Sequence, residues 1–246
     1  KLNMAKNMGP DAHIVFNADD AQLTLAVEGH GAQLTPFSII RSGLTYSLDS
    51  NHVNTLDGNQ LIAVEDIALP GQHNLSNMLS AATASHLMGI SNDHIVHVMK
   101  TFTGVEHRLE YVTTTNEVTY INDSKATNLD SVNVAIDSFK KPVVLILGGR
   151  NKGADFRLLL PHIKSSHVRD IISYGEAGGH ILTAIGDAVR SVQVTDLKSA
   201  VETARTLAAP GDVVLLSPGC ASFDQFSNFE ERGQYFKTMV MELAKS

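Results

Sequence analysis

Residues 142–149 read PVVLILGG, a continuous apolar run that ends in two glycines. Similar runs follow at 168–175 (VRDIISYG), 191–196 (SVQVTD) and 212–218 (DVVLLSP), and amphipathic stretches such as LKSAVETARTLAA (197–209) lie between them. Continuous apolar strands that alternate with helices are typical of a sheet that is covered on both faces. The sequence therefore predicts an α/β fold with a doubly wound, mostly parallel sheet.

The first hundred residues have a different pattern. An apolar strand is expected at 13–20 (HIVFNADD), and short alternating runs between residues 31 and 67, broken by Gly and Asn, indicate antiparallel strands. Apolar residues at helical spacing predict helices at about 74–87 and 92–102. Both helices end before Gly104, where we place a domain boundary.

After Gly104 a hairpin is expected at 109–123 (LEYVTTTNEVTYIND), followed by the alternating strands and helices. We therefore predict a boundary between 1–104, which holds only part of a sheet, and a second domain over 105–246, which is within ordinary domain size.

Composition narrows the class of protein. The 246 residues are 43% hydrophobic, enough for a sizeable core, and the net charge is −7. An acidic chain is unlike nucleic-acid or membrane-surface binders, which present basic patches. One cysteine, Cys220, cannot form an internal disulfide, which favours a reducing cytoplasm. There is no apolar run of about 18 residues. The start, KLNMAKNMG, reads like the middle of a helix, so we expect that an N-terminal portion is missing.

Polar side chains follow three of the predicted strands. These segments are INDSKATN (121–128), LGGRNKGADF (147–156) and LSPGCASFDQF (216–226). Ligands of such sheets bind beyond the carboxyl ends of the strands, and helix N-termini there attract anions. The three segments together predict a binding site at this edge of the sheet.

Lys152 lies in the glycine-rich second segment, where glycines permit close approach of the backbone to a ligand and lysine supplies a mobile charge. The alternative is a turn with a solvated lysine. The segment is not a P-loop, because no GxxxxGK[ST] string is present.

Asn74 and Asn77, in HNLSN (73–77), lie on one face of the first turn of a helix. The amide groups suit an adenine edge or a ribose, whereas the alternative is helix capping. Arg108, in GVEHR (104–108), is suited to stacking on a base or pairing with phosphate, the alternative being a salt bridge that involves Glu106.

Asp123, at a strand end, is a candidate for ribose hydroxyls, or else forms an Asx turn. In ASFDQFSNFEERGQYF (221–236), the residues Ser222, Phe223 and Phe229 are candidates for a small polar ligand. The alternative is a helix cap at Ser222 with phenylalanines in the core. Cys220 is interpreted as a buried small residue. The eleven histidines lack ligand spacing such as HExxH, so no zinc site is predicted.

These strings, with HNLSNMLSAA and NADD, resemble the Mur ligases of bacterial cell-wall synthesis, and their order and spacing between residues 73 and 236 make the resemblance specific. Among family members the strings are most similar to the enzyme that adds D-glutamate to UDP-N-acetylmuramoyl-L-alanine. The DNPR string of the diaminopimelate- or lysine-adding member is absent.

The resemblance implies the second half of a central ATPase domain followed by a C-terminal Rossmann-like domain that brings the amino acid. It implies ATP and Mg²⁺, with the P-loop and the metal ligands in a missing upstream part. In the family's reaction, ATP phosphorylates a carboxylate, and the amine of D-glutamate attacks the acyl phosphate and displaces phosphate. A cytoplasmic monomer is expected.

The resemblance also assigns residues. Asn74, Asn77, Arg108 and Asp123 match positions at the nucleotide. Lys125 and His107 are the candidate catalytic residues. The positions around D-glutamate are Thr127, Lys152, Ser222, Phe223 and Phe229. Some relatives have leucine at the position of Phe223, and a contact through the backbone would survive that change. The string RNKG also differs from some relatives.

Two alternatives stay open. A relative of folylpolyglutamate synthase shares the architecture and also adds glutamate, although CASFDQFSNFEERG (220–233) argues against it. A non-catalytic nucleotide- or amino-acid-binding module is the other, and the absence of a P-loop string favours it for this stretch of sequence.

Overall fold

The computed structural model describes residues 2–49, 51–69 and 71–244. The chain forms two compact units, Lys1–Thr103 and Gly104–Ser246. No described helix is long and apolar enough to cross a membrane.

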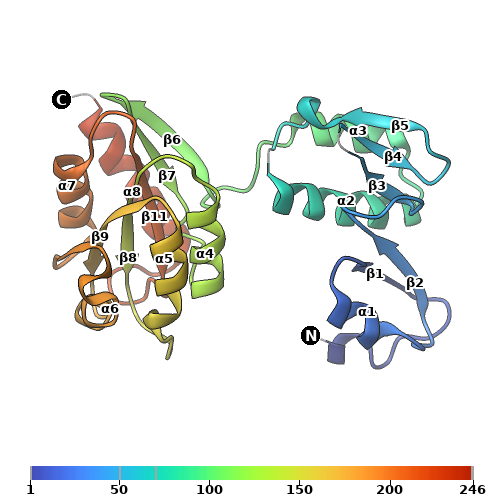
Figure 1. Ribbon diagram of the computed structural model, residues 1–246, viewed down its shortest axis with the longest axis horizontal. Helices are drawn as coiled ribbons and strands as arrows, with labels where there is room; N and C mark the ends of the chain where they lie inside the picture. Colours follow the sequence, from blue (N-terminus) through green and yellow to red (C-terminus); the bar gives the residue numbers. More distant parts are fainter. Residues whose placement is uncertain (1, 50, 70, 245–246) are drawn as a thin grey trace. The chain divides into compact units, whose positions relative to one another are not determined.

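The second unit is built on one six-stranded sheet with the strand order β10-β9-β8-β11-β7-β6 (Figure 1). All neighbours in this sheet are parallel except β6 and β7, which form the antiparallel hairpin that the sequence predicts. The doubly wound, mostly parallel fold is therefore confirmed. The strands are β6 (Glu110–Thr115), β7 (Val118–Asn122), β8 (Val143–Gly148), β9 (Val168–Tyr174), β10 (Arg190–Gln193) and β11 (Val213–Gly219).

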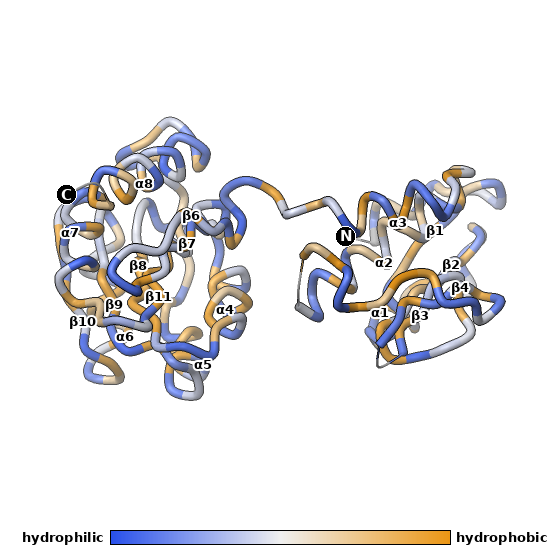
Figure 2. The backbone as a smooth tube through the Cα atoms, turned by 90° about the horizontal axis from the view of Figure 1, so that it is seen from above, coloured by the Kyte–Doolittle hydropathy of each residue, from blue (hydrophilic) through white to orange (hydrophobic). Residues whose placement is uncertain are grey.

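Helices cover both faces of this sheet. Val143, Leu145 and Leu147 of β8 pack on the face that carries α4, α5 and α6, whereas Val144 and Ile146 pack against α7 and α8. In Figure 2 hydrophobic colour runs along β8, β9 and β11. The helices are α4 (Leu129–Asp137), α5 (Leu160–Ser165), α6 (Gly178–Ile185), α7 (Leu197–Leu207) and α8 (Phe229–Leu243), with short 3₁₀ turns at Phe156–Leu159 and Gly186–Ala188.

Burial on both faces explains why the apolar runs are continuous rather than alternating. Every residue of β8 is buried, and each large side chain that leaves water contributes roughly 1.5–3 kcal/mol. This rigid centre fixes the ends of the strands, from which the polar segments emerge.

The first unit contains two small sheets. β1 and β2 are parallel, whereas β3, β4 and β5 are antiparallel. Two helices, α2 and α3, pack with the antiparallel strands in one core. The bounds are β1 (His13–Asn17), α1 (Ala21–Val27), β2 (Gln33–Phe37), β3 (Tyr46–Leu48), β4 (His52–Thr55), β5 (Gln60–Ala63), α2 (Gln72–Leu87) and α3 (Asn92–Thr101), with 3₁₀ turns at Leu2–Met4 and Val64–Asp66.

One strand prediction is wrong. The run that contains β2 was expected to be antiparallel, but β2 pairs with β1 in parallel register. The reason is α1, a short helix capped by Asp20, which returns the chain to the start of the sheet. Such a crossover allows neighbouring strands to run in the same direction.

Candidate functional site

The segment after β7 begins with Asp123, whose carboxyl group is buried and held on two sides. Oδ2 accepts a hydrogen bond from Ser217 Oγ (2.7 Å) and Oδ1 accepts one from the Leu109 amide (3.2 Å). The Asp123 amide itself donates to the carbonyl of Leu216 in β11 (2.7 Å). Neighbouring segments therefore fix this side chain at the carboxyl edge of the sheet.

Burial raises the pKa of Asp123 to about 6, and the two hydrogen bonds and the positive charge of Arg108 oppose the rise only in part. Asp123 is 4% exposed, so its charged form loses most of its hydration. The group therefore titrates close to neutral pH. Arg108 is exposed, and its charge acts on Asp123, so the structure brings these two predicted residues into the same neighbourhood.

Lys125 and Thr127 continue the same segment. The exposed ammonium of Lys125 lies over the ring of Phe229, 5.2 Å from its centroid, and the Lys125 amide donates to the carbonyl of His107 (3.0 Å). Thr127 is half-buried and precedes Asn128, whose side chain caps α4 by accepting from the Ser131 amide (2.9 Å). A cation and a hydroxyl thus stand at the N-terminus of a helix, where anions are favoured.

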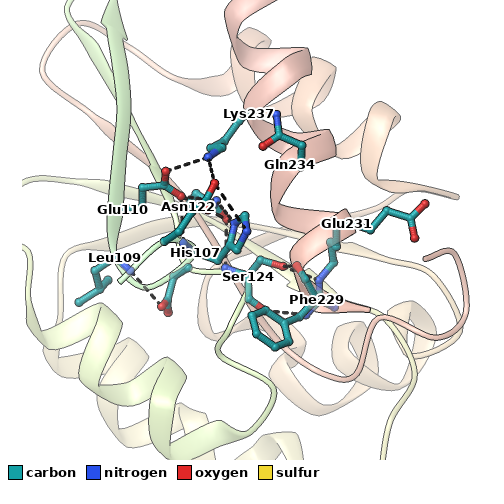
Figure 3. A network of polar contacts seen from close by, with 12 residues as sticks. His107, Leu109, Glu110, Asn122, Ser124, Phe229, Glu231, Gln234 and Lys237 are labelled. Carbon is teal, nitrogen blue, oxygen red and sulfur yellow. Dashed lines mark hydrogen bonds and ion pairs between the residues drawn. The ribbon is translucent and has the colours of Figure 1, made fainter. Parts of the chain in front are cut away.

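His107 is buried at the centre of a polar network (Figure 3). The amide nitrogen of Asn122 lies 2.9 Å from His107 Nδ1 and 2.9 Å from Glu110 Oε2. An amide NH₂ group can only donate, so Nδ1 accepts and the ring proton of a neutral His107 is on Nε2. The imidazole also meets the ring of Phe229 edge-on, with 6.2 Å between centroids. His107 therefore supports Phe229 from one side while Lys125 covers it from another.

Glu106 does not form the salt bridge considered for it with Arg108. Its carboxylate accepts from Lys237 Nζ (2.5 Å), and this hydrogen bond lowers the pKa of Glu106. Lys237 also donates to Glu110 (2.9 Å). Glu106, His107 and Glu110 are the one group in the described part of the chain with metal-ligand spacing. Because the ammonium of Lys237 already contacts both carboxylates, these residues do not fit a divalent cation.

The segment after β8 turns at Gly148 and Gly149, both with positive φ (152° and 119°). A side chain at Gly149 would collide with the carbonyl of Ala221, so glycine is required there. This close approach lets Arg150 and Ala221 exchange backbone hydrogen bonds (2.8 and 3.1 Å). Lys152, two residues further on, is exposed.

Ser222, Phe223 and Phe229 lie after β11. Ser222 is 2% exposed, and it does not cap α8, because the cap is Asn228, whose side chain accepts from the Glu231 amide (2.6 Å). Phe223 is 59% exposed and Phe229 is half-buried, so the reading of both as core residues is wrong. Cys220 is 1% exposed, as predicted for a buried small residue, and burial raises its pKa to about 12.

Asn74 and Asn77 belong to the first unit. Both lie in the first turns of α2, with Asn74 half-buried and Asn77 exposed. The N-cap residue of α2 is Gly71, which has no side chain to form a capping hydrogen bond. Neither asparagine is therefore the N-cap residue of α2.

The structure brings the candidates of the second unit together through their loops. Gly219 donates to the carbonyl of Ala126 (2.9 Å), which joins the segment after β11 to the one after β7, and the Arg150–Ala221 pair joins it to the one after β8. Asn74 and Asn77 form a separate group in the first unit. The residues joined in the second unit are His107, Arg108, Asp123, Lys125, Thr127, Lys152, Ser222, Phe223 and Phe229.

The sequence did not point to several residues that hold these candidates. Asn122, Glu110 and Lys237 form the network around His107, and Lys237 is 127 positions from Glu110. Arg232 is completely buried. The only indication of this in the sequence is its spacing, which places it on the same helix face as the apolar residues Phe229 and Phe236.

Comparison with known proteins matches residues 107–220 to the family described as "Mur ligase, glutamate ligase domain". Over 246 residues the whole chain is 41% identical to the UDP-N-acetylmuramoylalanine–D-glutamate ligase of Shouchella clausii, and it covers 54% of that protein. It is 41% identical over 250 residues to the Lactobacillus helveticus ligase of the same name, covering 99% of this chain and 53% of that protein. The chain thus spans about half the length of these relatives.

Solved structures show the same fold. MurF from Acinetobacter baumannii matches with a TM-score of 0.63 and 15% identity, over 99% of this chain and 54% of that one. A bifunctional folylpolyglutamate synthase/dihydrofolate synthase from Yersinia pestis matches with a TM-score of 0.66 and 16% identity, over 96% of this chain and 55% of that one. At these identities the likeness concerns the fold alone.

Proposed function

With residues 107–220 matching the family described as "Mur ligase, glutamate ligase domain", we propose that this chain is part of an ATP-dependent ligase that adds D-glutamate to UDP-N-acetylmuramoyl-L-alanine in peptidoglycan synthesis. The observation that carries the proposal is the 41% identity to D-glutamate ligases, which extends through both units. In this proposal Lys1–Thr103 is the second half of a central ATP-binding domain, and Gly104–Ser246 is the C-terminal domain that binds the amino acid.

D-Glutamate would bind at the joined loops of the second unit. Lys152 is exposed, and in this proposal its ammonium pairs with a carboxylate of the amino acid. Thr127 and Ser222 supply hydroxyl groups, and Phe223 and Phe229 exclude water from the bound ligand. This division follows the burial of the residues, because Lys152 and Phe223 are exposed whereas Ser222 is buried.

For nucleotide binding we assign Arg108 and Asp123 of this unit and, separately, Asn74 and Asn77 of the first unit. Arg108 is exposed and free to stack or to pair with phosphate. Asp123 presents a carboxyl group that titrates near neutral pH, suited to ribose hydroxyls because it can accept and, when protonated, donate.

Lys125 lies where negative charge accumulates as the acyl phosphate forms and phosphate leaves. Its ammonium is held over Phe229 and its amide is fixed by His107, so little reorganisation is needed when charge develops. His107 itself has Nδ1 engaged by Asn122 and is buried. We therefore assign it to positioning Lys125 and Phe229 rather than to proton transfer.

The proposal includes Mg²⁺ with ATP, a cytoplasmic location and action as a monomer. The Glu106–His107–Glu110 group does not suit the ion because Lys237 already bridges its carboxylates.

The proposal is tested with the full-length protein that contains this chain. Phosphate release is measured with ATP, UDP-N-acetylmuramoyl-L-alanine and D-glutamate, and we expect turnover only when all three are present. L-Glutamate in place of D-glutamate is the control for stereochemistry. Residues 1–246 alone, which contain no P-loop string, are expected to give no turnover.

The same assay separates the alternatives. Phosphate release with a reduced folate and L-glutamate, and none with the UDP precursor, would identify the folylpolyglutamate synthase alternative. Binding of ATP or D-glutamate without turnover in any combination would identify a binding module and overturn the proposed ligase.

A further inference from the structure

Arg232, in the first turn of α8, has the largest fully buried side chain among the described residues. Arginine is almost never fully buried unless it is paired. No carboxylate in the described part of the chain lies within ion-pair distance of Arg232, so its charge is met by neutral groups alone. An arrangement this costly points to a role other than stability.

The guanidinium joins three segments of the candidate site. Nε donates to Ser124 Oγ (2.9 Å) and Nη2 to the Ser124 carbonyl (2.8 Å), in the segment after β7. Nη1 donates to the carbonyl of Cys220 (3.1 Å), in the segment after β11. Ser124 Oγ in turn donates to the carbonyl of Phe229, the first residue of α8 (2.8 Å).

Each anchored residue is next to candidate residues for D-glutamate. Ser124 precedes Lys125 by one position and Thr127 by three, and Cys220 precedes Ser222 by two. A side chain added at Gly149 would come within 3.1 Å of Arg232 Nη1, so the loop of Lys152 also packs on the guanidinium. By contrast, Asp123 has its own anchors in Ser217 and Leu109.

We propose that Arg232 is a positioning residue of the D-glutamate site, whose planar guanidinium holds the loops after β7 and β11 in register with the start of α8. This inference rests on the proposed ligase function. Arg232 itself does not touch the ligand. Its fork geometry is the essential property, because a lysine keeps the charge but cannot donate along three directions in one plane.

Kinetics of the full-length protein test the role. Arg232→Lys and Ser124→Ala are expected to raise the KM for D-glutamate about 10-fold or more and to lower kcat, because small displacements of reacting groups cost up to roughly 100-fold in rate. The KM for ATP is expected to change less than 3-fold, since Asp123 keeps its anchors. Arg157→Gln is the matched control, because Arg157 is exposed and pairs with its neighbour Asp155.

A second measurement on residues 1–246 reports loop position without any assay of activity. Cys220 is the one cysteine of the chain, and its thiol is buried. Its reaction with a thiol reagent is expected to be slow in the unaltered chain and at least about 10-fold faster in Arg232→Lys, because the variant frees the carbonyl that holds this segment. Asp170→Asn is a control that loosens the opposite end of the sheet and should leave the thiol slow.

The outcomes are distinct. One outcome is that the unaltered protein turns over and that Arg232→Lys and Ser124→Ala keep its KM for D-glutamate and its rate of thiol reaction. This outcome overturns the positioning role alone. In another outcome both variants have normal KM values, and a lower melting temperature fully accounts for their faster thiol reaction. This outcome also overturns the positioning role. Absence of turnover in the unaltered protein overturns the proposed function and, with it, the role toward D-glutamate. Arg232→Gln is added as a charge-free variant, and if it fails to fold the other two variants decide.

Discussion

The two ends of the sheet in the second unit treat buried charge in opposite ways. Near the amino ends of the strands, the buried carboxylate of Asp170 accepts from Arg169 (2.8 Å) and from Arg190, and Arg169 also reaches Asp212 (2.8 Å). At the carboxyl ends, the carboxyl group of Asp123 meets a hydroxyl and an amide, and Arg232 meets a hydroxyl and carbonyls. At the amino end the buried carboxylates form ion pairs with arginines, whereas at the carboxyl end Asp123 and Arg232 form hydrogen bonds with neutral groups only, among the residues that the structure describes.

This difference separates a structural end from the end at which we propose ligand binding. Asp170 and its arginines are complete without any ligand, so they contribute to folding alone. Buried charges that the protein leaves unpaired are costly, and such departures from the usual rules are expected at functional sites. The carboxyl end, where three polar loops are tied together, is therefore the part of the sheet on which ligand effects should concentrate.

The largest expected effect is that of Lys152→Ala in the full-length protein. If Lys152 pairs with a carboxylate of D-glutamate, its loss removes a charge-assisted hydrogen bond of about 1.5–3 kcal/mol, which raises the KM for D-glutamate roughly 10- to 100-fold. The exposed side chain contributes little to folding, so the melting temperature should not change.

Lys140→Ala is the matched control, because this exposed lysine precedes β8 at the opposite end of the sheet. Its KM for D-glutamate should equal that of the unaltered protein. An unchanged KM in Lys152→Ala, or an equal rise in both variants, would remove the distinction between the two ends.

The pH dependence of stability should have opposite signs at Asp123 and Asp170. The folded-state pKa of Asp123 is raised to about 6, so folding favours its protonated form and its contribution to stability falls as pH rises from about 4 to about 6. Asp123→Asn has no such titration. The stability of the variant relative to the unaltered chain should therefore rise by about 2 kcal/mol between pH 4 and pH 7.

Calorimetric unfolding of residues 1–246 across this pH range measures the difference. Asp130→Asn, at an exposed position of α4, is the control and should show no comparable slope. A flat difference for Asp123→Asn would mean that this carboxyl group is better solvated than its burial indicates.

Asp170→Asn is expected to have a smaller effect on stability and none on the site. Burial of Asp170 raises its pKa, but Arg190 and Arg169 overcome this and leave the pKa below its ordinary value. Stability from the pair is therefore present above about pH 4 and is lost as pH falls through the folded-state pKa. At pH 7 the variant should lose about 1–2 kcal/mol, discounted because both arginines are partly exposed.

Denaturant unfolding of Asp170→Asn beside Asp187→Asn, an exposed aspartate after α6, measures that loss. Kinetics of the full-length Asp170→Asn protein should give the KM of the unaltered enzyme for D-glutamate. A raised KM would show that the amino ends of the strands are coupled to the candidate site, contrary to the proposed difference between the two ends of the sheet.

The sequence predicted the layers and the edge of the sheet at which the polar candidate loops come together, because apolar runs and strand-end polarity are local properties. It did not predict the direction of β2, because α1 is a seven-residue helix with too few turns for a clear period. Nor did it indicate Arg232, since charge favours the surface and only distant groups such as Cys220 explain its burial. The Asn122–His107 contact was likewise invisible, because pairing across a fold leaves no mark in spacing.

The smallest expected effect extends the comparison to the first unit. Asn77 lies on α2 beyond the N-cap position, which Gly71 occupies, so it has no capping role to lose. Asn77→Ala should therefore leave the melting temperature unchanged or slightly raised, since alanine is the better helix former. If Asn77 contacts the nucleotide, ATP binding by the full-length protein should weaken by about 1 kcal/mol, or roughly 5-fold, through the loss of neutral hydrogen bonds. Gln72→Ala, an exposed first-turn residue of the same helix, is the control and should leave ATP binding unchanged. Isothermal titration with ATP measures both variants beside the unaltered protein. A drop in stability with normal ATP binding would return Asn77 to a purely structural role and confine the ligand-binding residues of this chain to the second unit.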